Sequence, residues 1–416
     1  MKKKTAILIS HYSPEPQYWG MPRYHEWGKR LIKEGYNVYL LCASTVHSSG
    51  KNIIEKGKKY CIKENEGIKY VYIRCSPYEG NGVSRIRNLI DFYFGVKRVL
   101  RELPYPSVII SESPNPLGAV AGIQFAKKHH IPHIVDVVDL WPESIVVYQG
   151  ISNNNPIIQM MYKGEKWIYK NSCAIIFSTP GAYDYIVEHH WQSTIPKDKV
   201  YYINMGVDLK ENDFNKSSYI YEDPVFDDKG IFKVTYTGSV RLVNNLQMLC
   251  DAGKEIQLRG YSNIFIMIHG AGDQVEELSE YCVNEGIKNV KLYGRIDKKY
   301  IPYVLANSDL CILCYQNTPL LRFGGSMNKM FDYFASGKPI IANAKMGHSI
   351  IDEYRCGIEL DSNDPKALAE KILEYYVMPT EERELIGKHS REAAIAYDLP
   401  KLCDELIRIV EKVESL

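Results

Sequence analysis

The sequence predicts an α/β protein with two domains, each built on a parallel sheet. Short apolar segments alternate with helical segments along the chain, a pattern typical of parallel sheets covered by helices. The chain has 416 residues, which is more than one core usually supports and suits two domains. Hydrophobic residues make up 45% and charged residues 24%, as expected for a folded soluble protein.

The beginning of the chain predicts a strand, a loop, a helix and a second strand. These elements are expected at residues 5–10, 11–20, 22–34 and 38–43. Ligands of parallel sheets bind at the carboxyl ends of strands, so this loop is a candidate site of chemistry. His11, Glu15 and Arg23 are the candidate ligand contacts near it. The alternative is that they face water.

Residues 320–342 carry the most specific signal, because they join a glycine pair to a helix and the helix to a buried strand. Gly324 and Gly325 let the backbone approach a ligand closely. Ser326 is predicted to cap a helix over residues 327–336. The first amide groups of such a helix carry partial positive charge and suit a phosphate.

Two side chains of this helix extend the predicted anion site. Lys329 adds a full positive charge one turn into the helix, and Asp332 follows on the same side. A carboxylate there could bind a sugar hydroxyl beside a phosphate, so the pattern predicts a nucleotide site. The alternative is an ordinary amphipathic helix whose apolar side chains pack in the core.

Residues 328–342, Asn-Lys-Met-Phe-Asp-Tyr-Phe-Ala-Ser-Gly-Lys-Pro-Ile-Ile-Ala, resemble the donor-sugar motif of retaining glycosyltransferases of family four. The resemblance is strongest to the capsule and O-antigen branch, which includes N-acetylfucosaminyltransferase-like enzymes. It implies the GT-B fold, in which two Rossmann-like domains face each other across a cleft. The family motif has two glutamates. Asp332 falls on the second and Gly324 on the first, so the first carboxylate is missing.

The resemblance also implies how the chain is divided. Residues 1–208 would form the acceptor-binding domain and residues 209–385 the nucleotide-sugar domain, while residues 386–416 would return to the first domain as helices. The stretch 210–229 reads as the linker.

Further motifs resemble the same family. Asp139-Leu-Trp-Pro-Glu-Ser144 matches a signature of the branch, and Asp139 is the candidate for positioning the acceptor hydroxyl. The family's phosphate-binding arginine and lysine fall on Ser239 and Asn244, so Arg241 and Lys329 are the available substitutes. The implied catalytic residues are Asp139, Arg241 and Lys329. The implied acceptor contacts are His11, Glu15, Arg23 and Asp139. The implied donor contacts are Gly20, Gly238, Ser239, Arg241, Arg295, Ile296, Gly325, Ser326, Met327, Asn328, Lys329 and Asp332.

The implied reaction moves a sugar from a nucleotide donor, expected to be a UDP-sugar, to a sugar hydroxyl with retention of configuration. The expected acceptor is a polyprenyl-diphosphate-linked saccharide of capsule or O-antigen synthesis. The chain has no Asp-x-Asp triplet, so neither a metal nor another cofactor is expected. Two alternatives are a catalytically degenerate relative that binds another transferase, and a Rossmann dehydrogenase. The second needs a Gly-x-Gly-x-x-Gly turn, which residues 11–20 do not supply.

Charge is distributed unevenly along the chain. Residues 1–205 contain 26 Lys and Arg against 17 Asp and Glu, whereas residues 206–416 contain 25 against 33. The helix expected at residues 84–101 carries a basic cluster of Arg85, Arg87, Lys97, Arg98 and Arg101. Its apolar side is expected to pack on the sheet, which leaves the cluster for lipid phosphates.

These charges predict a protein that is peripheral on the cytoplasmic face of the membrane and binds anionic lipid through its first domain. No nucleic-acid partner is expected. The alternative is a basic face in water. No apolar run is long enough to span a bilayer.

The ten cysteines are scattered except for Cys311 and Cys314, which lie in an apolar run. A zinc site would need a second pair of ligands, and none is evident. Core thiols in a reducing cytosol are therefore expected.

Overall fold

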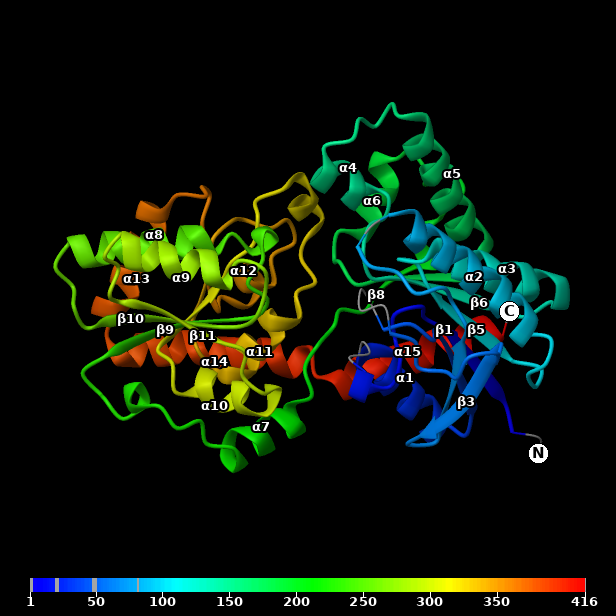
Figure 1. Cartoon of the computed structure of the whole chain (residues 1–416), viewed down its shortest axis with the longest axis horizontal. Coiled ribbons are helices and arrows are strands. Elements are labelled where there is room, and N and C mark those ends of the chain that lie inside the picture. Colours follow the sequence, from blue (N-terminus) through cyan, green and yellow to red (C-terminus); the bar gives the residue numbers. More distant parts are fainter. Residues whose placement is uncertain (1–2, 19–21, 47–50, 81, 416) are drawn as a thin grey trace. The chain divides into compact units, whose positions relative to one another are not determined.

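The computed structural model describes residues 3–18, 22–46, 51–80 and 82–415. The chain divides into two compact units (Figure 1). The first contains residues 1–204 together with 400–416, and the second contains residues 205–399. The division between the units thus falls after residue 204 and before residue 400. The boundaries predicted from the sequence were after residue 208 and before residue 386. Residues 386–399 stay with the second unit because most of them belong to a helix that packs on the helix after the glycine pair.

An eight-stranded sheet forms the core of the first unit, in the order β3-β4-β2-β1-β5-β6-β7-β8. Its pairings are parallel except for β3 with β4. The strands are β1 (Thr5–Ile9), β2 (Asn37–Ala43), β3 (Tyr60–Asn65), β4 (Ile68–Ile73), β5 (Val108–Glu112), β6 (His133–Val137), β7 (Ala174–Phe177) and β8 (Val200–Tyr202).

Helices cover both faces of this sheet, with α2 and α3 on one face and α1 and α15 on the other (Figure 1). The α-helices of the unit are α1 (Pro22–Lys33), α2 (Val83–Val99), α3 (Pro116–His129), α4 (Glu143–Gln149), α5 (Pro156–Asn171), α6 (Ala182–Glu188) and α15 (Leu399–Glu414). The strand order reverses between β1 and β5, and ligands of such sheets bind at this switch point.

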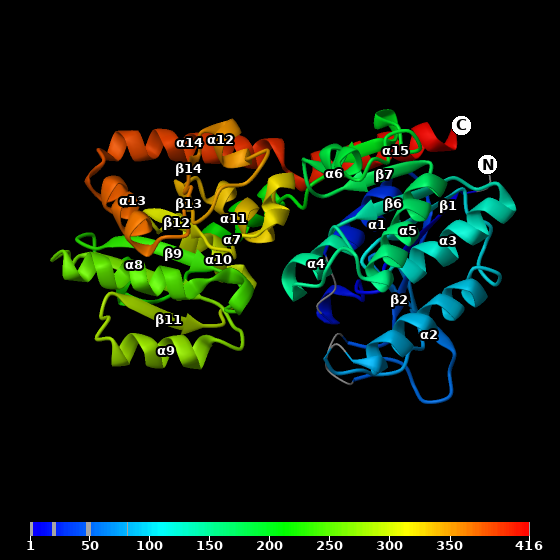
Figure 2. The same ribbon diagram turned by 90° about the horizontal axis from the view of Figure 1, so that it is seen from above.

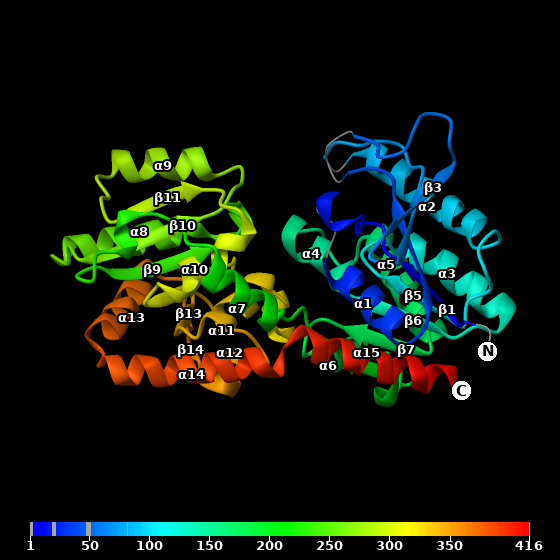
Figure 3. The same ribbon diagram turned by 90° about the horizontal axis from the view of Figure 1, so that it is seen from below.

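A six-stranded parallel sheet forms the core of the second unit, in the order β11-β10-β9-β12-β13-β14. The strands are β9 (Phe232–Thr237), β10 (Ile264–His269), β11 (Val290–Gly294), β12 (Leu310–Leu313), β13 (Ile340–Ala342) and β14 (Gly357–Glu359). The α-helices are α7 (Leu209–Ser218), α8 (Leu246–Leu258), α9 (Val275–Asn284), α10 (Ile301–Ala306), α11 (Asn328–Ser336), α12 (Ile350–Tyr354), α13 (Pro365–Val377) and α14 (Thr380–Ala396). Figures 2 and 3 show these layers from two further sides.

The structure corrects the orientation expected for α2. The helix buries Asn88, Phe92, Val96 and Val99 rather than the side that carries Ile86 and its neighbours. Asn88 is tolerated inside because its amide donates to Thr45 Oγ1 at 3.0 Å and to the carbonyl of Ser76 at 2.7 Å. The stripe predicted to pack on the sheet is therefore largely at the surface.

One further expectation is wrong, and one strand was not predicted. The stretch 210–229 is not a structureless linker, because α7 forms there and packs on α10. The segment before β4 contains strand β3, which sequence reasoning missed because its alternating half-buried pattern is rich in charge.

Candidate functional site

Lys329 lies at the centre of the polar cluster in the second unit. It is on the first turn of α11, and its amine donates to the hydroxyl of Tyr236 at 2.7 Å and to Oδ1 of Asn244 at 2.9 Å. The amine also lies 4.5 Å from the centre of the Tyr236 ring. Burial lowers the pKa of Lys329 to about 8, and the amine is nevertheless mostly protonated at neutral pH.

The loop after β9 is held close to this amine. Asn244 donates to the carbonyl and the hydroxyl of Ser239 at 2.9 and 2.8 Å, and Tyr236 donates to the same carbonyl. Gly238 has φ of +145°, and a side chain there would begin 3.0 Å from Cε of Lys329. The structure thus brings together Gly238, Ser239 and Lys329, three of the predicted donor contacts.

A glycine pair after β10 shapes the loop from the other side. A Cβ at Gly270 would lie 1.7 Å from the Gly238 carbonyl oxygen, and one at Gly272 would lie 1.9 Å from that of Val240. Only glycine permits this contact of backbones. Sequence reasoning did not include these glycines among the site residues, although their place right after a strand was the available signal.

The start of α11 differs from its prediction. The helix begins at Asn328 and its N-cap is Met327, with no side-chain capping bond, so Ser326 is not the cap. Gly337 ends the helix with φ of +68°. Gly325 packs so closely on Met346 that a Cβ would lie 2.5 Å from its sulfur. The first amides of α11 are left without side-chain caps and can bind an anion.

Asp332 is half-buried, three residues beyond Lys329. Its pKa is raised to about 6 by burial, while Lys298 opposes the rise. No hydrogen bond or ion pair of this carboxylate occurs within the described chain, so its oxygens remain open to a ligand.

The remaining predicted donor contacts lie farther out on the surface. Arg241 and Arg295 are exposed, and Ile296 is half-buried just beyond β11. The hydrogen bonds that hold Lys329 do not include Arg241. Gly20 lies outside the described residues.

In the first unit, Arg23 belongs to the buried framework. It is 3% exposed, and its Nε and Nη2 donate to the two oxygens of Asp136 at 3.0 and 2.9 Å. It also donates to the carbonyls of Ile203 and Asn204. All three guanidinium nitrogens are engaged, so this geometry does not support the acceptor contact predicted for Arg23.

His11 and Glu15 are also buried, at 3% and 5% exposed, so neither faces water. His11 packs edge-on against Phe92, and Glu15 accepts a hydrogen bond of 2.8 Å from Tyr72. These positions leave Asp139 as the exposed member of the predicted acceptor set.

Asp139 follows β6 at the carboxyl edge of the sheet. Beside it, β5 ends in Glu112, a buried carboxyl that sequence reasoning missed. Glu112 accepts a hydrogen bond from Ser10, and burial raises its pKa to about 8. An acid at the end of an apolar strand was the signal that could have revealed it. Glu143 begins α4.

The cysteines and acids give no sign of a metal centre. Cys311 and Cys314 are buried free thiols, as predicted. Among the described residues, no group of three or more His, Cys, Asp or Glu could hold a metal ion.

Both halves of the chain match glycosyltransferase families. Residues 23–211 match the family described as Glycosyltransferase Family 4, and residues 231–377 match Glycosyl transferases group 1. The chain is a family-4-type glycosyltransferase. No curated protein sequence matches it.

Solved structures support the GT-B fold of this glycosyltransferase. Sucrose-phosphate synthase from Thermosynechococcus elongatus aligns with a TM-score of 0.73 at 15% identity, over 99% of this chain and 100% of that one. A trehalose-6-phosphate protein from E. coli bound with UDP-2-fluoro glucose aligns with 0.74 at 11%, over 99% of both chains. Anabaena HepE in complex with UDP aligns with 0.67 at 14%, over 99% and 100%.

Proposed function

We propose that this glycosyltransferase transfers a sugar from a UDP-sugar to a sugar hydroxyl with retention of configuration. The observation that carries the proposal is the position of Lys329, a half-buried cation at the start of α11 with a carboxylate one turn later. A diphosphate would contact Lys329 and the first amides of α11, and the ribose hydroxyls would bind Asp332. Two structures of similar fold contain UDP or a UDP-sugar analogue, which supports this donor.

In the proposed reaction, the bond between the anomeric carbon and the diphosphate breaks while the acceptor oxygen bonds to the same carbon. Negative charge grows on the leaving diphosphate, where Lys329, Arg241 and the start of α11 stabilise it without a metal. In the mechanism that the family resemblance implies, the leaving phosphate accepts the proton of the acceptor hydroxyl. Asp139 is then needed to position the acceptor rather than to act as a base.

The acceptor in this proposal is a polyprenyl-diphosphate-linked saccharide of capsule or O-antigen synthesis, reached at the cytoplasmic face of the membrane. Helix α2 supports a membrane location. Its exposed apolar residues recur at helical spacing on one side: Val83, Ile86, Ile90 and Phe94, which are 82%, 57%, 42% and 60% exposed. Arg87 and Arg98 are exposed on the same helix, so apolar insertion and binding to anionic lipid can act together.

No helix in the described part of the chain is long and apolar enough to cross a membrane. The proposed attachment needs none, because an amphipathic helix with a basic cluster can bind a bilayer surface.

The experiment that tests the function is incubation of the purified protein with a panel of UDP-sugars, with UDP release as the readout. We expect slow hydrolysis of one sugar class, and none by a Lys329→Ala sample purified in parallel. UDP binding without release from any sugar would instead favour the degenerate relative. The glycine at the place of the first motif glutamate is the observation behind that alternative.

A further inference from the structure

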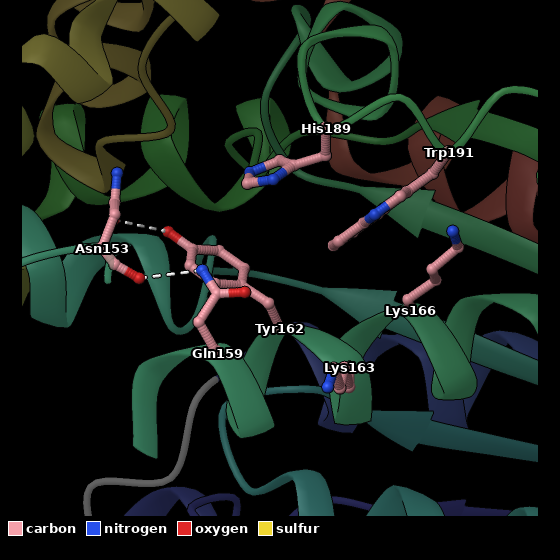
Figure 4. A pocket seen from close by; sticks show the side chains of 7 residues that line it. All are labelled: Asn153, Gln159, Tyr162, Lys163, Lys166, His189 and Trp191. Atoms are coloured by element: carbon pink, nitrogen blue, oxygen red, sulfur yellow. Dashed lines mark hydrogen bonds between the residues drawn. The ribbon is translucent and has the colours of Figure 1, made fainter. Parts of the chain in front are cut away.

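The first unit contains a pocket whose lining residues do not belong to the candidate site. It has a volume of about 360 Å³ and is formed by Asn153, Gln159, Tyr162, Lys163, Lys166, His189 and Trp191 (Figure 4). Small-molecule sites occupy roughly 300–1,000 Å³, so the pocket fits a small ligand such as one sugar unit.

Helix α5 supplies one wall of the pocket. Gln159, Tyr162, Lys163 and Lys166 are spaced by three or four residues and therefore lie on one side of the helix. Asn153, in the turn before the helix, fixes the entrance. Its carbonyl accepts a hydrogen bond of 2.8 Å from Gln159, and its Oδ1 lies 3.4 Å from the Tyr162 hydroxyl (Figure 4).

Aromatic rings form the opposite wall. His189 stacks on Trp191 with 4.6 Å between ring centres and an angle of 25°, and it lies 4.8 Å from Tyr162. Behind them, the buried carboxylate of Glu143 accepts a hydrogen bond from Tyr162 and lies 3.7 Å from Nε2 of His189. This wall is therefore fixed before any ligand arrives.

The charge of the lining is entirely basic. Two of the seven lining residues are lysines, and none is acidic. Neither lysine makes a hydrogen bond, ion pair or ring contact within the described chain. Other lysines of the protein, such as Lys29 and Lys254, pair with glutamates. Lys166 is half-buried and Lys163 is exposed, and a half-buried lysine without an acidic partner favours binding of an anion.

The aromatic wall decides which anion fits. Trp191 is 6% exposed and its ring is covered by His189, so no broad aromatic face is open to a nucleobase. The side-chain amides of Asn153 and Gln159 offer donors and acceptors instead, as hydroxyl groups require.

We propose that this pocket binds an acidic sugar unit, with its carboxylate or phosphate on Lys163 and Lys166 and its hydroxyls on Asn153 and Gln159. The inference rests on the proposed function for the source of this sugar, which would be a part of the acceptor glycan remote from the reacting hydroxyl. The binding itself needs no turnover.

The test is a titration of the full chain, saturated with UDP, with sodium glucuronate, glucose 6-phosphate and glucose, followed by calorimetry or ligand-observed NMR. We expect saturable binding of at least one acid and about 10-fold weaker binding of glucose, because glucose cannot form the charge-assisted hydrogen bonds with the lysines. The two acids distinguish a carboxylate site from a phosphate site.

Lys163→Gln with Lys166→Gln should weaken the binding of that acid by about 10-fold or more. Lys170→Gln is the matched control, since Lys170 is exposed on the same helix outside the pocket, and it should change the affinity by less than about twofold. Absence of saturable binding, equal affinity for glucose, or an equal loss in Lys170→Gln would overturn the inference. If acid binding persists while no UDP-sugar is hydrolysed, the proposed function fails and this site stands.

Discussion

The amine of Lys329 lies 2.9 Å from Oδ1 of Asn244, the residue at which the family pattern places a lysine. The two positions are far apart in sequence, but α11 and the loop after β9 bring them to one place. The asparagine holds the amine at this position. We therefore propose that Lys329 supplies the positive charge that the family pattern places at residue 244.

Loss of the cation should slow the reaction. Lys329→Ala and Arg241→Ala should each reduce UDP-sugar turnover by about 100-fold or more, because each removes a positive charge from the developing phosphate. Lys338→Ala is a suitable control, since Lys338 follows the other end of α11. Steady-state rates of the three variants decide the matter, and near-normal turnover in both test variants would remove these residues from the site.

Asp332 should make donor affinity depend on pH. Its pKa is raised to about 6, so the carboxylate that we propose accepts the ribose hydroxyls is lost as pH falls through that value. UDP should bind more tightly at pH 7.5 than at pH 5. Asp332→Asn should weaken binding more than it lowers the maximal rate, and it should flatten this pH dependence. A lower rate with unchanged affinity would point to a different role for Asp332.

Glu112 should destabilise the fold as pH rises. Burial raises its pKa to about 8, whereas the unfolded chain releases the same proton near pH 4.3. Between these values the folded state binds more protons, so its stability falls with increasing pH. The melting temperature of Glu112→Gln relative to wild type should therefore rise by several degrees from pH 5 to pH 8. Glu79→Gln, at an exposed position, should show no such trend.

Helix α2 should bind anionic vesicles. Co-sedimentation with phosphatidylglycerol vesicles should fall with added salt and after Arg87→Glu with Arg98→Glu, because each basic residue near such a surface contributes about 1 kcal/mol. Ile90→Ser with Phe94→Ser should also weaken binding. Reversal of Lys128 and Lys170, which lie on α3 and α5, is the charge-matched control. If the protein stays in the supernatant at low salt, the membrane proposal fails and a soluble acceptor is favoured.

Periodicity and motifs were enough to predict the fold and the helix that carries Lys329. The strand expected at residues 5–10 is β1 (Thr5–Ile9), and α11 ends at Ser336 as predicted, just before Gly337. Both depend on local rules, namely an apolar run between polar residues and a glycine with positive φ.

What could not be predicted depends on contacts between distant segments. Arg23 was predicted as an acceptor contact because nothing near it in the sequence reveals Asp136, which holds it from β6. The face of α2 was misjudged because apolar residues occur on two sides of that helix, and only the partners of Asn88 show which side is buried. The pocket beside α5 likewise needs the turn at His189, which the sequence places well after the helix.

The most direct measurement of the central claim is calorimetric titration of UDP and UMP into wild type and Lys329→Ala, with Lys338→Ala as the control. The account predicts that wild type and Lys338→Ala bind UDP about 10-fold or more tightly than UMP, and that Lys329→Ala loses most of this preference. If Lys329→Ala keeps the wild-type preference for the diphosphate, the claim that Lys329 and the start of α11 hold the donor diphosphate is contradicted.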